Sequence, residues 1–247
     1  MSCNPAMGGI AKGQIVREID ALGGYSGVVS DLTAIQFKML NKSKGPAMWS
    51  PRVQSDRAKF ALKWREMLEN TPNLDFDRAV VVDLNVEQNT IKGVVTGLGN
   101  KIHSHSVILT NGTFLNGLIH VGDKNFGGGR VGEKSSVGIT ADLESYGFKS
   151  GRMKTGTPPR VDGRSLDYSV MEEQPGDKNP AKFSYLESIQ PLKHQISCHI
   201  TYTNSEVHDI MSESFDRSPM FNGSISSTGP RYCPSIEDKI HRFSERE

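Results

Sequence analysis

The sequence predicts a mixed α/β protein, and three features of the chain lead to this class. Two segments in the first 72 residues place apolar side chains at helical spacing. From residue 79 the pattern changes to short β-prone runs separated by turn residues, which end in the apolar strand Val107–Leu109. Helical patterns return on either side of a polar stretch over residues 161–195. With 247 residues, 36% of them hydrophobic, the chain is long enough for one large or two modest domains with a buried core.

The first element that we expect is a loop over Ser2–Gly13, where a thiol, a proline and three glycines are crowded together. Glycine lets a backbone approach another group closely, because it has no Cβ. Such loops normally hang from a rigid scaffold, and no strand precedes this one in the sequence. Either the loop is unusual, or the chain is a piece of a larger protein that has lost its beginning.

Two helices are expected after this loop. The first covers Gln14–Leu22, and its apolar face consists of Ile15, Val16, Ile19 and Leu22. The second is expected to have Ser50 as its N-cap and Pro51 at its first position, and to end at residues 70–72. Its apolar positions are Val53, Phe60, Ala61, Trp64, Met67 and Leu68.

A β-meander that feeds a buried strand is expected next. Its runs are Ala79–Val86, Ile91–Thr96, Lys101–His105 and Ser106–Leu109. Many flavoproteins that bind two nucleotides are built this way, because a small residue after the buried strand lets the backbone approach the flavin. An ordinary αβ layer gives the same pattern. In the flavoprotein interpretation, backbone groups of Val81 would bind adenine, although the pattern does not separate Val81 from Val80.

The remaining elements are spaced around the polar stretch 161–195, which we interpret as an excursion or an inserted subdomain. A helix is expected over Ile139–Tyr146 before it and a strand over Ile196–Thr203 after it. Two more helices are expected over Ser205–Ser214 and Ser235–Phe243. The chain stops abruptly after entering the last helix, so we interpret both of its ends as cut.

The charge of the whole chain excludes strong non-specific attraction to nucleic acid or membranes, because the net charge is only +1. Residues 38–65 differ, since they hold eight basic side chains against the single acid Asp56. This basic patch is made of Lys38, Lys42, Lys44, Arg52, Arg57, Lys59, Lys63 and Arg65. It fits either a phosphate-contacting surface for a nucleotide or RNA or an ordinary solvated helix face.

Three scattered cysteines argue against a disulfide framework and for a reducing cytosol. Cys198, with His199 and His208, fits no structural zinc spacing, so no metal is expected. Cys3 and Cys233 are each followed closely by proline. Cys233 precedes a helix, whose unpaired N–H groups can favour a reactive thiolate, but either cysteine could equally be inert and buried. The sequence has no signal-peptide pattern and no apolar run of the roughly 18 residues that a membrane span needs.

Five motifs carry a resemblance to one family. They are Ser2–Gly13 (SCNPAMGGIAKG), Asn41–Ala47 (NKSKGPA), Lys154–Arg160 (KTGTPPR), Cys198–Asn204 (CHITYTN) and Gly229–Lys239 (GPRYCPSIEDK). In this order they resemble the signatures of the MnmG family, also called GidA, the flavoprotein subunit of a tRNA-modifying enzyme. Because the motifs are long and span nearly the whole chain, the resemblance is specific.

The resemblance implies a fold and its division into domains. Residues 1–155 would form a partial FAD-binding, Rossmann-like domain of the glutathione-reductase type that contains the β-meander. Residues 156–230 would form an inserted α/β nicotinamide-nucleotide subdomain, and residues 231–247 a segment returning to the FAD domain. The family begins with a strand and a GxGxxG loop for the FAD pyrophosphate, which this sequence lacks. We therefore expect an internal fragment that neither binds FAD tightly nor catalyses by itself.

The resemblance also implies an activity. Family members use FAD and NADH to place a carboxymethylaminomethyl or aminomethyl group on C5 of the wobble uridine of tRNA, with methylenetetrahydrofolate as the carbon donor. They are cytoplasmic homodimers that form a heterotetramer with the GTPase MnmE. Two alternatives stay open: a folate- and FAD-dependent tRNA uridine methyltransferase, and a non-catalytic RNA-binding remnant. The GPRYCPSIEDK segment speaks against the methyltransferase.

The resemblance finally assigns roles to residues of this sequence. Cys233 and Cys3 match the two functionally important cysteines, and Cys233 is the better candidate for catalysis. The expected FAD contacts are Gly8, Gly9, Lys12, Gly13, Val81, Gly112, Gly129, Arg130 and Ser136. The expected nicotinamide-nucleotide segment is Gly229, Pro230, Arg231, Tyr232, Cys233, Pro234, Ser235, Ile236, Glu237, Asp238, Lys239, Ile240, His241, Arg242 and Phe243. With the resemblance, the basic patch favours tRNA or phosphate contact through Lys42, Lys44, Arg52 and Arg57.

Overall fold

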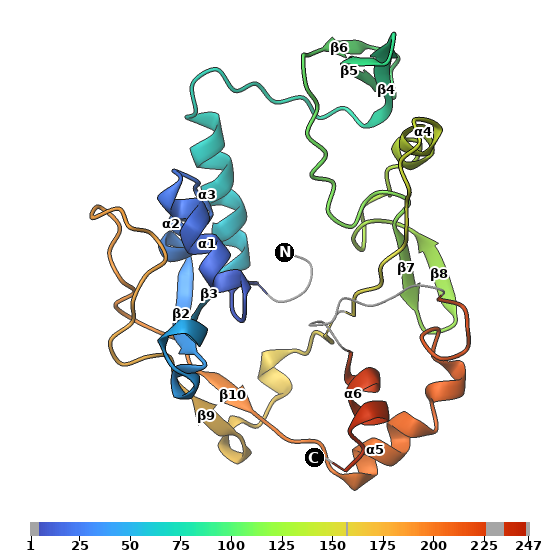
Figure 1. The fold of residues 1–247 in the computed structure, drawn as a ribbon. Helices are drawn as coiled ribbons and strands as arrows, with labels where there is room; N and C mark the ends of the chain where they lie inside the picture. Colours follow the sequence, from blue (N-terminus) through green and yellow to red (C-terminus); the bar gives the residue numbers. More distant parts are fainter. Residues whose placement is uncertain (1–4, 157, 226–234, 246–247) are drawn as a thin grey trace. The chain divides into compact units, whose positions relative to one another are not determined.

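The fold is that of a computed structural model, which describes residues 5–156, 158–225 and 235–245 (Figure 1). The chain forms two compact units, and each is described by itself. The first unit combines Met1–Leu74 with Thr157–Tyr202, and the second combines Asp75–Gly156 with Thr203–Glu247. The two units are therefore both discontinuous in sequence.

The first unit is built on a three-stranded antiparallel sheet with the order β1 (Ala6–Gly8), β3 (Ser50–Ser55), β2 (Ala34–Leu40). Val53 is opposite Met7 on β1 and Phe37 on β2, so these apolar residues line up across the sheet. Val53 and Phe37 form the core of the unit together with two other buried side chains, Val16 and Phe183. One face of a small sheet thus carries the core, because successive side chains of a strand point to opposite faces.

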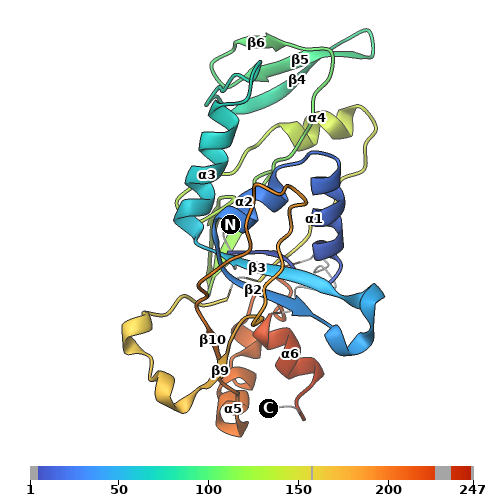
Figure 2. The ribbon, with the colours of Figure 1, turned by 90° about the vertical axis from the view of Figure 1, so that its left-hand side faces the viewer.

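Three helices accompany this sheet: α1 (Lys12–Ala21), α2 (Ser26–Leu32) and α3 (Arg57–Glu69) (Figure 2). The sequence predicts α1 almost within its observed limits. The expected apolar face of α1 is not buried as a whole, however. Val16 is buried, whereas Ile15, Ile19 and Leu22 are exposed.

The predicted start of the second helix is wrong, because residues 50–55 form strand β3 instead of its first turns. Val53 is fully buried in the sheet, and the carbonyl oxygen of Pro51 accepts a hydrogen bond from Gly9 N at 2.8 Å. The helix starts at Arg57, after Asp56. Asp56 Oδ1 accepts hydrogen bonds from the N–H groups of Ala58 and Lys59, which makes it a better N-cap than Ser50.

The polar stretch after residue 157 returns to the first unit. It contains two short 3₁₀ turns, η3 (Gly163–Ser165) and η4 (Tyr168–Val170). It also contains the antiparallel pair β9 (Glu172–Gln174) and β10 (Cys198–Ile200), the latter within the strand predicted over residues 196–203. Two further 3₁₀ turns, η1 (Lys42–Lys44) and η2 (Pro46–Met48), connect β2 to β3.

Two carboxylates, the buried Asp20 and the half-buried Asp31, anchor this stretch to the helices. Asp31 accepts hydrogen bonds from the N–H groups of Phe183 and Ser184 at 2.9 and 2.8 Å, and Asp20 accepts one from Tyr185 N at 2.7 Å. Because Phe183 and Ser184 are buried, their N–H groups cannot bond to water. The Asp31 carboxylate provides the acceptors, and without it these buried N–H groups would destabilise the fold.

The second unit contains the predicted β-meander. Strands β4 (Val81–Glu87), β5 (Thr90–Thr96) and β6 (Lys101–His103) form an antiparallel sheet in sequence order. Helix α4 (Ile139–Ser145) forms where a helix is predicted, and Asp142 Oδ2 accepts a hydrogen bond from Leu84 N on β4 at 2.7 Å. A hairpin of β7 (Leu118–Val121) and β8 (Lys124–Gly127) was not expected.

The prediction of a buried strand over residues 106–109 is wrong for the described structure. No strand is formed there, and the side chain of Ile108 is 84% exposed. A buried strand needs neighbours that satisfy its N–H and C=O groups, and β6, the preceding strand, already ends at His103. An apolar run therefore does not make a buried strand without a sheet to receive it.

The C-terminal part of the second unit contains helices α5 (Ser205–Ser212) and α6 (Ile236–Arg242), with the 3₁₀ turn η5 (Phe215–Arg217) between them. Both helices lie within the predicted segments. Among the helices of the described ranges, none is long and apolar enough to cross a bilayer.

Candidate functional site

Two of the residues expected to contact FAD are in contact with each other in the second unit. Ser136 Oγ donates a hydrogen bond to the carbonyl oxygen of Val81 at 3.4 Å. The backbone of Ser136 is also held on both sides, because its N–H donates to Phe114 O and its carbonyl accepts from Asn116 N, each at 2.8 Å. The start of β4 and the Ser136 loop therefore form one hydrogen-bonded corner.

The glycine-rich segment after residue 111 folds against this corner. Thr113 Oγ1 donates to Gly129 O at 2.6 Å, and a Cβ on Gly129 would lie only 2.3 Å from the ring of Phe114. Packing within the protein therefore requires a glycine at position 129. Arg130, its neighbour, forms an ion pair with Glu133 at 2.5 Å.

The expected FAD contacts near the N-terminus lie in the first unit. A Cβ on Gly8 or on Gly13 would lie 2.3 or 2.6 Å from the carbonyl oxygen of Pro51, so packing explains both glycines. Gly9 differs, because its φ is +89° and, among the described residues, no atom beyond its chain neighbours lies within 4 Å of the Cβ position. Lys12 is exposed at the start of α1.

The glycines among the expected FAD contacts fall into two groups according to what surrounds their Cβ positions. Gly9 and Gly112 both have positive φ and open space at the Cβ position, which is the arrangement that a closely approaching ligand needs. Gly8, Gly13 and Gly129 are explained by the protein's own packing. Seven other glycines share the open Cβ position and positive φ, so backbone geometry at Gly9 and at Gly112 is compatible with FAD but does not single out these two positions.

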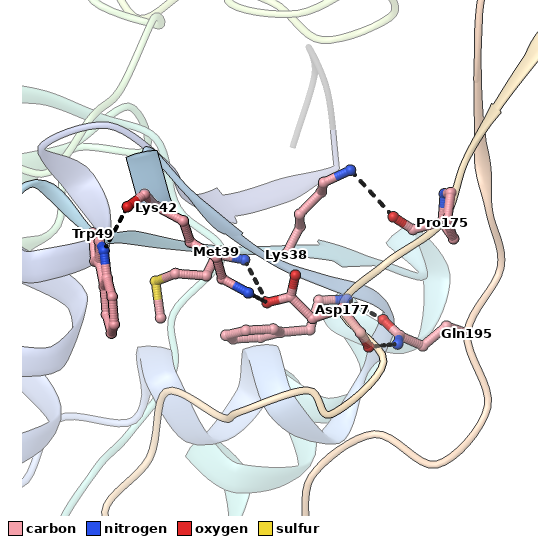
Figure 3. Close-up of polar contacts among 8 residues, drawn as sticks. Lys38, Met39, Lys42, Trp49, Pro175, Asp177 and Gln195 are labelled. Carbon is pink, nitrogen blue, oxygen red and sulfur yellow. Dashed lines mark hydrogen bonds and ion pairs between the residues drawn. The ribbon is translucent and has the colours of Figure 1, made fainter. Parts of the chain in front are cut away.

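The basic patch does not form one surface of free charges. Figure 3 shows Lys42 directed at Asp177, whose Oδ2 lies 3.0 Å from Lys42 Nζ and also accepts a hydrogen bond from Met39 N. Lys38 Nζ donates to Pro175 O, and Gln195 Nε2 donates to Asp177 O. The polar stretch therefore places the Asp177 carboxylate beside Lys42, although the two residues are 135 positions apart in the sequence.

Other members of the basic patch are paired as well. Lys63 and Arg65 form ion pairs with Glu66 and Glu69 at 2.8 and 2.6 Å, and these two acids lie just beyond the basic window. Lys59 Nζ lies 3.9 Å from Asp56 Oδ2. Much of the local positive charge that the sequence indicates is therefore neutralised on the surface of α3.

Three candidate phosphate contacts remain after these pairs. Arg52 lies half-buried on β3, where it donates to Gln36 Oε1 at 3.3 Å while its buried Nε has no partner among the described residues. Lys44 and Arg57 are exposed, and no ion pair is formed by either within the described part of the chain. Lys44 and Arg57 are thus the basic side chains most available to a phosphate.

The two cysteines expected to be functional, Cys3 and Cys233, lie outside the described residues, as do all of residues 229–234. Cys198 is described, and its Sγ accepts a hydrogen bond from Gln54 Nε2 at 3.1 Å. The ring of His199 contacts that of Tyr168 in a tilted arrangement, with centroids 4.7 Å apart, and His208 Nε2 is 2.9 Å from Thr203 Oγ1. Within the described ranges, no cluster of His, Cys, Asp or Glu could hold a metal ion.

Two of the family motifs meet in the second unit. Lys154 Nζ lies 3.6 Å from Asp238 Oδ2, and a Cβ on Gly156 would lie 3.2 Å from Ser235 Cβ. Ser235 caps α6, and Asp238 completes a capping box with it. Reasoning from the sequence missed this contact, because nothing in the spacing of residues 154 and 238 indicates that they are neighbours.

Two buried or partly buried carboxyl groups were also missed. Burial raises the pKa of Asp31 above its usual range, although hydrogen bonds from Phe183 and Ser184 oppose the rise. Desolvation likewise raises the pKa of Asp142, and the neighbouring Asp83 adds to the rise. Both carboxyl groups hold backbone N–H groups of another segment, which identifies them as structural.

Comparisons with known proteins agree with the resemblance found in the sequence. A family model described as "Glucose inhibited division protein A" matches residues 1–247. Proteins named tRNA uridine 5-carboxymethylaminomethyl modification enzyme MnmG are 70% identical in Christiangramia forsetii and 71% identical in Flavobacterium johnsoniae. Each match covers 100% of this chain and 40% of the relative, so the chain spans about two fifths of their length.

The fold is similar to that of solved structures. Aquifex aeolicus GidA in its form I crystal is 47% identical, with a TM-score of 0.91 over 100% of this chain and 42% of that one. The form II crystal gives a TM-score of 0.89 at 45% identity, with 100% of this chain and 40% of that chain covered. The predicted mixed α/β class and the family resemblance are both confirmed.

Proposed function

The chain belongs to the glucose inhibited division protein A family, and we propose from this membership that it is part of a flavin-dependent enzyme that modifies the wobble uridine of tRNA. The observation that carries the proposal is the match of all 247 residues to relatives named for tRNA uridine modification. No shorter shared motif would support the activity as well, because fold alone does not define function.

The reaction that we propose adds a carboxymethylaminomethyl or aminomethyl group to C5 of the wobble uridine. FAD and NADH are the cofactors, and methylenetetrahydrofolate is the carbon donor. When bound, FAD supplies redox chemistry that protein side chains cannot perform. The partners are the tRNA, a second copy of the chain and the GTPase MnmE, and the location is the cytoplasm.

The roles of the residues follow from the same family assignment. Val81 and Ser136 are proposed to hold the FAD nucleotide, a role that their mutual hydrogen bond supports. Gly9 and Gly112 would allow the backbone to approach the cofactor, because the Cβ position at each is open. Cys233 is the proposed catalytic thiol, with Cys3 as the second cysteine of the reaction.

Residues 1–155 are the proposed FAD-binding part, and residues 156–230 are the proposed nicotinamide-nucleotide insertion. The segment 231–247 would return toward the FAD-binding part. The compact units of the fold have different limits from these proposed parts. Thr157–Tyr202 belong to the first unit, and Thr203–Glu247 belong to the second. The proposed limits refer to cofactor binding and are tested by nucleotide-protection mapping.

The proposal is tested in a chimera in which residues 1–247 replace the segment that they match in the Flavobacterium johnsoniae relative. The chimera is expressed in a strain that lacks its own copy of this enzyme, and tRNA nucleosides are analysed by mass spectrometry. We expect the carboxymethylaminomethyl or aminomethyl nucleoside to be restored. A 5-methyluridine product instead would overturn the proposal in favour of a methyltransferase.

The same assay tests the catalytic thiol. We expect Cys233→Ser to abolish the modification and Cys198→Ser to preserve it, because Cys198 only accepts a hydrogen bond from Gln54 and contacts Gln36. Unchanged modification in the Cys233→Ser chimera would remove the catalytic assignment of this cysteine.

A further inference from the structure

Helix α6 begins at a contact with a segment about 80 residues earlier in the chain. The Lys154 ammonium lies 3.6 Å from Asp238 Oδ2, and the two side chains are only 23% and 16% exposed. An ion pair that is largely shielded from water is screened less by salt than an exposed one. Salt should therefore weaken this contact less than it weakens the exposed pair of Arg65 and Glu69 on α3.

The same carboxylate serves two partners. Asp238 Oδ2 accepts a hydrogen bond from Ser235 N at 3.4 Å, and Ser235 Oγ accepts one from Asp238 N at 3.2 Å. Ser235 Oγ also lies 3.4 Å from Met220 Sδ. Because Lys154 acts on the oxygen that completes the capping box, its charge supports the first turn of the helix.

Close packing reinforces the ion pair. A Cβ on Gly156 would lie 3.2 Å from Ser235 Cβ, so a larger residue at position 156 would press on the capping residue. At the other end of α6, His241 contacts the rings of Phe215 and Phe221, with centroids 6.0 and 5.2 Å away. A helix of this length is unstable alone in water, so these contacts determine where α6 lies in its unit.

The segment that carries Lys154 is also tied to the proposed FAD corner. Arg152, two residues earlier, donates a hydrogen bond to Asn116 O at 3.0 Å. The N–H of Asn116 donates in turn to the carbonyl oxygen of Ser136 at 2.8 Å. The segment from Arg152 to Lys154 thus contacts α6 and also contacts Asn116, which is hydrogen-bonded to Ser136.

We propose that Lys154 is a positioning residue for nicotinamide-nucleotide use. Through its ion pair with Asp238, it holds α6 in the placement that the nucleotide requires. The inference rests on the proposed function, because α6 is the described part of the expected nicotinamide-nucleotide segment. Lys154 acts through Asp238, so it is not a catalytic residue. Its loss should weaken the use of NADH and leave the reactivity of the bound flavin unchanged.

The test uses the full-length chimera and measures flavin reduction by NADH in stopped flow. For Lys154→Met we expect the NADH concentration for half-maximal rate to rise about tenfold, with the limiting rate unchanged. Lys154→Arg should keep the value near that of the unsubstituted chimera.

Lys149→Met is the matched control, since Lys149 is an exposed lysine of the same connecting segment. It should leave NADH use unchanged. Flavin content and reduction by dithionite are measured for every variant, and both should equal those of the unsubstituted chimera. Equal NADH dependence for Lys154→Met and Lys149→Met would overturn the inference. Equal losses for Lys154→Met and Lys154→Arg would overturn it too, because the positive charge beside Asp238 would then not be the cause.

Hydrogen exchange separates a failure of this inference from a failure of the proposed function. Amides of residues 236–242 should exchange faster in Lys154→Met than in Lys149→Met. If NADH does not reduce the flavin of the unsubstituted chimera, the NADH part of the proposed function is wrong. In that case the amide exchange of α6 is the remaining test of whether Lys154 positions the helix. Equal exchange in Lys154→Met and Lys149→Met would show that it does not.

Discussion

Ser136 Oγ donates a hydrogen bond to the carbonyl oxygen of Val81, 3.4 Å away, across 55 positions of sequence. The two residues were assigned to FAD independently, each from its own place in the family pattern. Their contact joins the first residue of β4 to the loop before α4. It gives the proposed nucleotide site a rigid corner, because backbone hydrogen bonds also hold Ser136 on both sides.

Loss of this contact should weaken FAD binding. In the chimera, Ser136→Ala should raise the Kd for FAD roughly fivefold, because one hydrogen bond contributes about 1 kcal/mol. Fluorescence titration of the apo-chimera with FAD measures this change. Ser135→Ala is the control and should bind FAD normally. If both variants bind equally well, Ser136 has no part in holding FAD.

Gly138 should tolerate no side chain. Its φ is +116°, and a Cβ there would lie 2.3 Å from the carbonyl oxygen of Val82. Gly138→Ala should therefore destabilise the β4–α4 packing by about 2 kcal/mol or more. The melting temperature of the chimera should fall by several degrees. Gly151→Ala, which meets no atom within 4 Å, should leave it unchanged. Equal melting temperatures for the two variants would contradict the packing argument.

Asp31 should make stability depend on pH. Burial raises its pKa in the folded state above the ordinary value of 3.8, so the protonated form is favoured by folding. The stability that this group contributes is fully present below the ordinary pKa and is lost as pH rises through the raised pKa.

The difference in unfolding midpoint between the chimera and its Asp31→Asn variant isolates this dependence, because other titrating groups cancel. The chimera should lose stability relative to Asp31→Asn as pH rises from about 3.8, the ordinary carboxyl value, toward neutrality. A difference that is constant over this range, or that changes in the other direction, would show that burial does not dominate at Asp31.

Lys44 and Arg57 should contact tRNA phosphates more than the paired lysines do. Lys44→Gln and Arg57→Gln should each raise the Kd for tRNA about threefold. Each should also make the slope of log affinity against log salt concentration shallower by about one, because one phosphate contact is lost. Lys63→Gln should change little, because Lys63 is already paired with Glu66 at 2.8 Å. Filter binding at several salt concentrations measures all three. A larger loss for Lys63→Gln would reverse this ranking.

The sequence determined the elements that depend on local pattern. Helices α1, α4, α5 and α6 and the meander β4–β5–β6 form where their spacing predicts them. Turn residues and periodicity act over short distances, so a single sequence contains the information for them. The family resemblance was determined in the same way, because five long motifs are present in the chain itself.

The errors arose where long-range pairing overrides local preference. Residues 50–55 resemble the start of a helix, but Val53 is needed opposite Phe37 in the sheet. Residues 106–109 resemble a buried strand, but no described strand pairs with them. The apparent charge excess around Lys42 is also reduced, because Asp177, which is 135 positions away in the sequence, forms an ion pair with Lys42.

The sequence by itself thus determined the family, the class and the chemistry of the candidate residues, because motifs and short-range periodicity are properties of neighbouring positions. Only the tertiary structure decided which residues act together. It joined Ser136 to Val81 and Lys154 to Asp238, and it paired Lys42 while leaving Lys44 exposed. The physical reason is that hydrogen bonds and ion pairs depend on distances of a few ångströms in space, which separation along the chain does not determine.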